Sequence, residues 1–188
     1  GALLHKAFAM LNWQGGKGTQ IVTKNGHLSF DSELTMPDHV DALEDGSILD
    51  FKGTETSNGS IVLMSFPITV YTKHMDMLNI RYSFPKGPKG VEVHYAYFSH
   101  QDDDDEMIKH RIRQSSNLLG PCGLISMEDA SVFSRIDKGN KTQGDAIFQK
   151  GVEDEYAIPL KVGQTDETGN LARWERYREL MGFERRAK

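Results

Sequence analysis

The sequence predicts an α+β fold, in which one antiparallel sheet packs against long helices. Two observations support this prediction. A hairpin signal at residues 19–30 is followed by four strand-like segments within residues 60–100. The second half of the chain then changes to helical segments with capping residues, at residues 102–120, 126–139 and 170–183.

The expected sheet begins with a hairpin. Asn25-Gly26 lies between two β-rich runs, TQIVTK and HLSF, which follow a glycine-rich break, QGGKG. The next segments are SIVLMSF, ITVYTKH, MLNIRYSF and VEVHYAYFSH, with the turn-rich PKGPKG between the last two. Consecutive β-rich runs separated by turns predict an antiparallel meander. We expect it to lie between Ile21 and His100 and to wrap around the helix that contains Asp129.

Helical spacing of apolar residues predicts a first helix in the opening segment ALLHKAFAML, with His5 beside the apolar stripe. This stripe consists of Leu3, Leu4, Ala7, Phe8 and Leu11. A closing amphipathic helix is predicted in NLARWERYRELMGF by a second stripe at steps of three and four residues. That stripe consists of Leu171, Trp174, Tyr177 or Arg178, and Met181.

Capping residues mark the two central helices. The acidic run at 102–105 suits a helix N-terminus, and Gly120-Pro121 is a stop signal. The run lacks the spaced ligands and central glycine of an EF-hand loop, so a solvated helix start is favoured over a calcium site. The next helix is expected to start at Ser126 and to end at Lys138-Gly139. Residues 140–169 are rich in Gly, Asp and Thr, and predict irregular chain or short strands.

Composition excludes several classes of protein. The chain has 188 residues, 38% of them hydrophobic, and a formal net charge of −5, which argues against a nucleic-acid surface. No apolar run approaches the roughly 20 residues that a membrane helix needs. The single cysteine, Cys122, cannot form an internal disulfide and fits a reducing compartment. We therefore expect a cytoplasmic protein that binds neither nucleic acid nor a membrane.

The sequence contains none of the common motifs for zinc peptidases, serine hydrolases or nucleotide binding. What remains is His5 on the first helix and the acids Glu128-Asp129 at the start of a later one. A histidine and a carboxylate on facing helices can both bind a metal, and two histidines with one carboxylate bind Fe(II) in non-haem oxygenases. The alternative is that His5 is a packing residue of its helix.

A resemblance to a known family extends over nearly the whole chain. The segment NLLGPCGLISMEDASVFSRIDKG resembles the catalytic domain of the large subunit of Rieske non-haem iron ring-hydroxylating oxygenases. The segments LLHKAF, NGHLSF, NIRYSFPKG, VEVHYAYF and ARWERYRELMGF resemble other parts of that domain, in the same order. The resemblance implies a helix-grip fold, with residues 1–188 as the carboxy-terminal part of the catalytic domain. The amino-terminal Rieske domain is expected outside this chain.

The same resemblance implies the roles of individual residues. In the family the iron helix carries a His-x-x-x-x-His pair, and His5 fits the second histidine, so the first would precede Gly1. Asp129 would be the carboxylate ligand of a mononuclear Fe(II), and Glu128 is the alternative. The other implied partners are O₂, a Rieske [2Fe-2S] cluster of a neighbouring subunit, and NAD(P)H acting through a separate ferredoxin or reductase. The implied assembly is a homotrimer or an α3β3 complex.

The closest resemblance is to the branch that acts on aromatic carboxylates such as salicylate, anthranilate and terephthalate. Members of that branch place an arginine over the substrate carboxylate at the position of Arg81. The alternative for Arg81 is an exposed cation on a strand. Gln164 stands where a dicarboxylate-binding member has a second arginine, which favours an aromatic monocarboxylate as substrate. Two other functions stay open: a helix-grip domain that binds ligands without catalysis, and an inactive oxygenase-like subunit.

Overall fold

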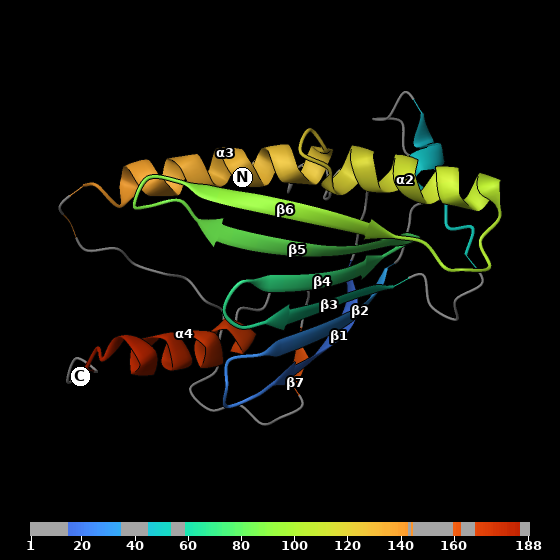
Figure 1. Cartoon of the computed structure of the whole chain (residues 1–188). Coiled ribbons are helices and arrows are strands. Elements are labelled where there is room, and N and C mark those ends of the chain that lie inside the picture. Colours follow the sequence, from blue (N-terminus) through green and yellow to red (C-terminus); the bar gives the residue numbers. More distant parts are fainter. Residues whose placement is uncertain are drawn as a thin grey trace.

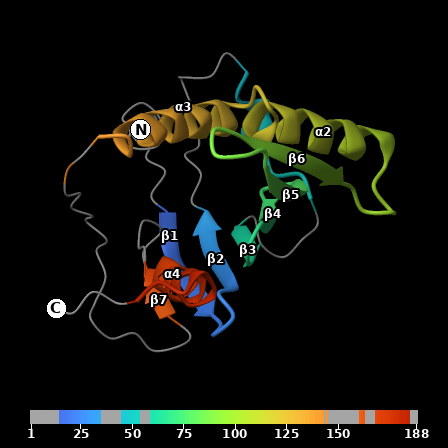
Figure 2. The same ribbon diagram turned by 60° about the vertical axis from the view of Figure 1, so that its left-hand side comes forward.

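The computed structural model describes residues 15–34, 45–53, 59–142, 144, 160–162 and 168–184. A curved sheet forms one layer, and helices lie along its inner side (Figure 1). Figure 2 shows helices α2 and α3 over one end of the sheet and helix α4 over the other end. The opening helix predicted around His5 lies outside the described residues, as does Gln164.

Within the described residues, the sheet has seven strands in the order β6-β5-β4-β3-β2-β1-β7, and every neighbouring pair is antiparallel. This confirms the predicted meander. β7 adds one edge strand from the region expected to be irregular or short-stranded. The bounds are β1 Gly15–Val22, β2 Leu28–Leu34, β3 Ser60–Ser65, β4 Thr69–His74, β5 Met77–Pro85, β6 Val91–Phe98 and β7 Leu160–Val162.

The first hairpin differs from its prediction at one end. Its turn is where Asn25-Gly26 predicted it, and Gly26 has a φ of 81°. However, β1 starts at Gly15, inside the segment QGGKG, for which the sequence predicts a break before the strand. The register of β1 against β2 shifts between Gly15 and Gly18. Glycines in a strand often mark such a bulge, so they bend this strand rather than end it.

The helices are η1 Gly46–Leu49, a short 3₁₀ turn, then α2 Asp105–Leu119, α3 Leu124–Gly139 and α4 Thr168–Met181. Asp104 caps α2 as the acidic run predicted, because its Oδ1 accepts a hydrogen bond of 2.8 Å from the Met107 amide. α3 begins two residues before the predicted Ser126. Its N-cap is Gly123, which makes no side-chain capping bond. None of the helices in the described part of the chain is long and apolar enough to span a membrane.

A buried carboxylate joins α2 to the turn between β4 and β5. Asp76 is fully buried and accepts hydrogen bonds from the amides of Lys52 at 2.7 Å and Gly53 at 2.9 Å. His110 Nε2 lies 3.0 Å from the same carboxylate. Gln114 Oε1 accepts a 2.9 Å bond from the Asp76 amide, so the turn is fixed to α2 through both backbone and side chain.

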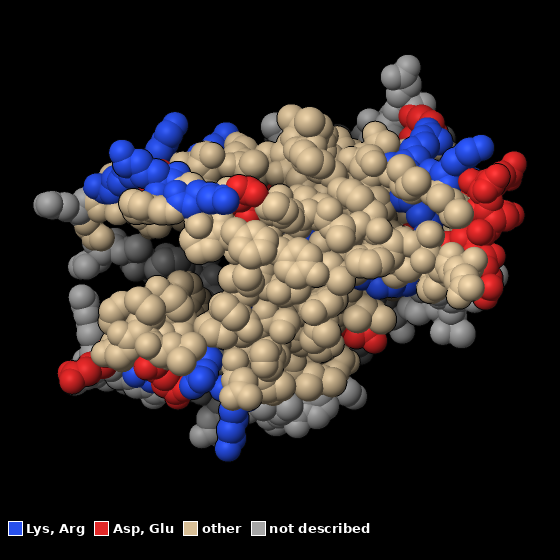
Figure 3. Space-filling model, in the orientation of Figure 1, with Lys and Arg blue, Asp and Glu red and all other residues tan. Residues whose placement is uncertain are grey.

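Two apolar clusters flank the inner side of the sheet. The larger joins η1, the β4–β5 turn, β5 and the end of α2, and consists of Ile48, Met75, Met77, Leu118 and Leu119. The smaller joins β1 and β2 through Val22 and Leu28, with Met64 of β3 packed against them. The outer side is more open, since Leu63 and Tyr71 are exposed there. Figure 3 shows few charges over the strands on the face turned to the viewer.

Candidate functional site

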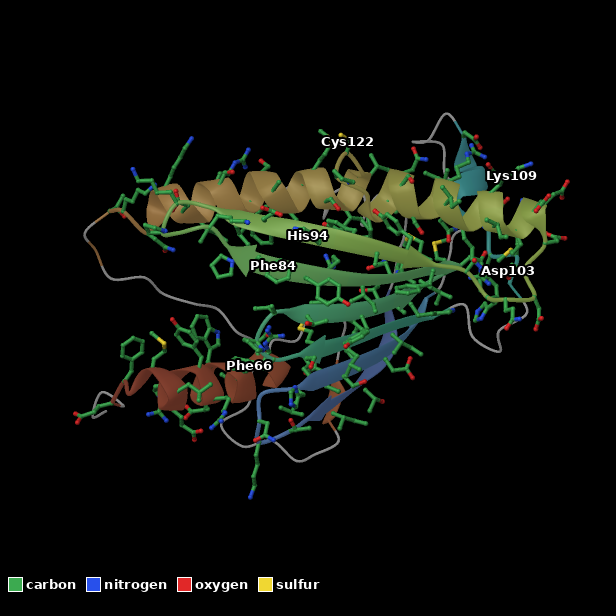
Figure 4. The ribbon with its side chains drawn as sticks, in the orientation of Figure 1. Phe66, Phe84, His94, Asp103, Lys109 and Cys122 are labelled. Carbon is green, nitrogen blue, oxygen red and sulfur yellow. The ribbon has the colours of Figure 1, made fainter. Side chains whose placement is uncertain are left out.

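Helix α3 is set close behind α2 by a tight turn of glycine and proline. The Gly123 amide donates a 2.8 Å hydrogen bond to the Gly120 carbonyl. A Cβ on Gly123 would lie 2.7 Å from the Leu118 carbonyl, so a larger residue does not fit without a shift of the backbone. Cys122 lies in this turn, on the side of the helices away from the sheet (Figure 4). The turn thus fixes where α3 begins over the sheet.

Asp129 lies on the side of α3 that faces the sheet. One turn before it, Ser126 Oγ lies 3.3 Å from the Tyr95 hydroxyl of β6, and residues three apart share a helix face. Burial raises the pKa of Asp129, the positive charge of Arg81 opposes this shift, and the charge of Glu128 adds to it. Asp129 is therefore a partly buried carboxylate in the electrostatic field of a strand arginine.

Arg81 lies on β5, between Val70 of β4 and Tyr95 of β6. It is partly buried, and its Nε is fully shielded and has no hydrogen-bond partner among the described residues. Because Tyr95 is its cross-strand neighbour and also contacts Ser126, Arg81 shares the side of the sheet that α3 covers. It is not a cation on an open strand surface.

The structure brings Arg81 and Asp129 to the same side of the sheet, although 48 residues separate them in the sequence. Glu128 is partly buried beside Asp129. His5 lies outside the described residues, so its distance from Asp129 stays a prediction. Within the described residues, no group of three histidine, cysteine or acidic side chains is arranged to hold a metal ion.

A separate cavity of about 590 Å³ lies at the amino end of α2, and neither Arg81 nor Asp129 lines it. Acidic residues gather there, at the right of Figure 3. Two of them have structural roles, since Asp104 caps the helix and Asp103 accepts a 2.7 Å hydrogen bond from Arg111 Nε. The Arg111 bond lowers the pKa of Asp103, against a smaller effect of burial. Figure 4 shows Asp103 at this end of the molecule.

Sequence reasoning missed four side chains near Arg81: Thr72, Asn79, Tyr95 and Ser126. A signal for Asn79 was present, because in MLNIRYSF it alternates with apolar residues and falls on the same side as Arg81. Nothing in a single strand predicts which side the helices cover. Thr72 could be recognised as part of the site only from the register of β4 against β5, which places it opposite Asn79.

Three curated proteins are similar to this chain over most of its length. The first is the terephthalate 1,2-dioxygenase terminal oxygenase component subunit alpha 2 of Comamonas sp., with 30% identity over 99% of this chain and 49% of the relative. The second is the anthranilate 1,2-dioxygenase large subunit of Burkholderia cepacia, with 33% identity over 75% of this chain and 33% of the relative. The third is the salicylate 5-hydroxylase large oxygenase component of Ralstonia sp., with 25% identity over 95% of this chain and 40% of the relative. The chain thus spans about half the length of the first relative and a smaller share of the other two.

A solved structure, the naphthalene 1,2-dioxygenase of Rhodococcus sp. bound to indole, superposes with a TM-score of 0.72. It matches 95% of this chain and 49% of that chain at 15% identity, which shows the shared helix-grip fold. No protein-family model matches the chain. By their names, the three sequence relatives are an alpha subunit, a large subunit and a large component of oxygenases for terephthalate, anthranilate and salicylate. The chain is therefore a homologue of the large subunits of Rieske aromatic-ring-hydroxylating oxygenases.

Proposed function

We propose that this chain is the iron-binding part of the catalytic domain of an oxygenase that hydroxylates an aromatic monocarboxylate. In this proposal Asp129 and His5 bind Fe(II), and Arg81 binds the substrate carboxylate. The main support is that Arg81 and Asp129 come from different elements and lie on the same side of the sheet, because Tyr95 neighbours Arg81 and also contacts Ser126, one turn before Asp129. The names of the three relatives, terephthalate, anthranilate and salicylate enzymes, all denote aromatic carboxylates and support the same substrate class.

The chemistry of Asp129 fits a metal ligand. It is a partly buried carboxylate whose ionisation is hindered by burial, so a cation beside it would replace the solvation it lacks. Carboxylate oxygen and imidazole nitrogen are the donor types that non-haem Fe(II) takes. When bound, the iron would activate O₂ with electrons from a Rieske cluster. In this proposal NAD(P)H reduces that cluster through a separate reductase.

Arg81 fits a carboxylate anchor for a physical reason. Its Nε donor is shielded from solvent and has no partner in the described part of the chain. A guanidinium offers two parallel donors to one carboxylate, and such a charge-assisted pair is strongest where water is excluded. Bound here, the acid would be held between β5 and α3, with its ring toward the side on which Asp129 lies.

The first arm of the test measures anion binding. Isothermal titration of the 188-residue chain with benzoate is compared for the wild type, Arg81→Leu, Arg81→Lys and the exposed control Arg135→Leu. Arg81→Leu should weaken benzoate binding by about tenfold or more, since a desolvated charge-assisted pair is worth about 1.5–3 kcal/mol. Arg81→Lys should recover part of the loss. Unchanged affinity in Arg81→Leu would contradict the carboxylate assignment.

The second arm measures metal binding. Anaerobic titration with Fe(II) is compared for the wild type, His5→Ala, Asp129→Asn and the neighbouring control Glu128→Gln. Binding should weaken in His5→Ala and Asp129→Asn, and stay within twofold in Glu128→Gln. A ligand-binding domain without catalysis would instead bind benzoate through Arg81 and show no dependence of Fe(II) binding on His5 or Asp129. That result would replace the oxygenase function with a carrier function.

A further inference from the structure

Strand β5 has its polar side under the helices and its apolar side outward. The covered side carries Met77, Asn79, Arg81 and Ser83, and the other side carries Leu78, Ile80, Tyr82 and Phe84. Met77 is fully buried and Asn79 is 3% exposed, whereas Phe84 is 41% exposed. Sheets normally bury the apolar side of a strand and leave the polar side to water. The reversal indicates that the polar groups on the covered side have a role other than packing.

Among the residues that the structure describes, several of the covered polar groups have no hydrogen-bond partner. Asn79 is nearly fully buried, yet both its Oδ1 and its Nδ2 lack a hydrogen-bond partner among the described residues. Thr72 lies directly opposite on β4, and its shielded Oγ1 also has no partner within that part of the chain. Buried donors and acceptors that stay unpaired destabilise a native protein, so native structures rarely keep them without a function.

These unpaired groups lie beside the proposed carboxylate anchor. Asn79 and Arg81 are two residues apart on one strand, so their side chains project to the same side. Arg81 presents positive donors, Asn79 presents one donor group and one acceptor, and Thr72 adds a hydroxyl that can do both. Together they match an anion with a neighbouring group that both donates and accepts hydrogen bonds.

The geometry points to a specificity role for Asn79 and Thr72: they bind a hydroxyl or amino substituent on the ring of the aromatic acid. This inference rests on the proposed function, because Arg81 would hold the carboxylate of the same molecule. An acid without the substituent would leave the buried amide and hydroxyl unpaired. Sites built to hydrogen-bond a substrate group reject analogues that lack it for this reason.

The test compares benzoate with 2-, 3- and 4-hydroxybenzoate by isothermal titration of the 188-residue chain. The wild type should bind one hydroxybenzoate at least about tenfold more tightly than benzoate. Asn79→Leu should reduce that preference to within about twofold, because it should weaken hydroxybenzoate binding more than benzoate binding. Thr72→Val, which keeps the shape of the side chain, should reduce the preference in part. Asn117→Leu, on the exposed side of α2, is the matched control and should keep the preference.

Thermal unfolding of the ligand-free variants separates this role from a structural one. Because the Asn79 amide has no hydrogen-bond partner within the described residues, Asn79→Leu should melt at the same temperature as the wild type or higher. A lower melting temperature with an unchanged hydroxybenzoate preference would overturn the inference. Equal weakening of benzoate and hydroxybenzoate would overturn it too. If Asn79→Leu does not fold, an unchanged preference in Thr72→Val refutes the inference and a reduced one supports it.

The affinities of the Arg81, Asn79 and Thr72 variants distinguish a wrong specificity role from a wrong carboxylate anchor. If Arg81→Leu weakens all four acids while Asn79→Leu and Thr72→Val change no ratio, the specificity role is wrong and the carboxylate anchor stands. If Arg81→Leu changes no affinity, the carboxylate anchor itself is wrong. A wild type that binds benzoate as tightly as every hydroxybenzoate contradicts the specificity role alone.

Discussion

At the scale of single residues, only part of the candidate site could be predicted from the sequence. Arg81 and Asp129 came from a family resemblance, and the Tyr95–Ser126 contact places both on the side of the sheet that α3 covers. Strand alternation placed Asn79 on the side of Arg81, but a role for Asn79 and Thr72 could not be predicted, because it depends on their burial without hydrogen-bond partners among the described residues. Burial of a polar strand side follows from where the helices pack, and a strand's own alternation does not encode it.

Buried titratable residues give the chain a pH-dependent stability, and His74 at the end of β4 is the clearest case. Burial, aided by the charge of Lys73, lowers the pKa of His74 from 6.5 to about 4. Between these values the unfolded chain binds a proton that the folded chain excludes. The contribution of neutral His74 is therefore fully present above pH 6.5 and is lost as the pH falls toward 4.

We predict that lowering the pH from 7.5 to 5.0 reduces the free energy of unfolding through His74 by about 2 kcal/mol. Urea unfolding at both pH values measures this difference for the wild type and for His74→Gln, which cannot titrate in this range. The variant should lose most of the difference, whatever its stability at pH 7.5. A variant with the same pH dependence as the wild type would show that His74 is solvated in the native state.

At the scale of elements, periodicity located the helices and strands well, and the closing helix is where its apolar stripe predicted it. The stripe does not show which side of α4 packs against the sheet, because the side chains of Trp174 and Met181 are 63% and 51% exposed. The contacts of α4 with the sheet instead involve Gly169, where an added Cβ would lie 2.7 Å from Leu28. Small residues allow close approach of a helix to a strand, and a hydrophobic stripe cannot reveal that.

The turn between α2 and α3 offers a test of how the site helix is positioned. Gly123→Ala places a Cβ 2.7 Å from the backbone of Leu118, so α3 must shift. We predict a loss of about 2 kcal/mol in the free energy of unfolding, as for overpacked sites. Because α3 carries Asp129, the proposed Fe(II) ligand, Fe(II) affinity should fall as well. Urea unfolding and metal titration measure the two effects.

Gly139→Ala is the matched control, because it lies at the other end of α3 and its Cβ would meet nothing within 4 Å. Alanine is favoured over glycine in a helix by about 0.5–1 kcal/mol, so this variant should be as stable as the wild type or more so. If both glycine variants unfold at the same urea concentration as the wild type, the tight turn does not constrain α3.

At the scale of the whole molecule, the antiparallel order of the sheet was predictable because its segments are consecutive in sequence and joined by short turns. Consecutive strands usually pair with each other. β7 pairs instead with β1, about 140 residues earlier in the chain, where Gly18 lies opposite Val162. A long-range pairing of three residues leaves no local pattern, so the edge strand could not be placed from the sequence.

The two apolar clusters differ in size, which predicts different local stability in the two halves of the sheet. The half with β5 and α2 combines five buried apolar residues with the hydrogen bonds around Asp76. The half with β1 and β2 has Val22 and Leu28 as its buried apolar side chains within the described residues. Regions with fewer buried contacts open at lower free energy. Amides of β5 and α2 should therefore exchange with deuterium most slowly, and those of β1 and β7 faster.

Truncation of one leucine in each apolar cluster tests the predicted difference in exchange. Leu28 and Leu118 are a matched pair, because they are 5% and 3% exposed and belong to different clusters. Leu118→Ala should lower the free energy of global unfolding by about 2–5 kcal/mol and accelerate exchange in every strand. Leu28→Ala should accelerate exchange in β1, β2 and α4, while β5 and α2 keep their protection. Equal acceleration of β5 and α2 by both variants would mean that the sheet unfolds as one cooperative unit, and that the proposed site on β5 shares its stability with the far edge.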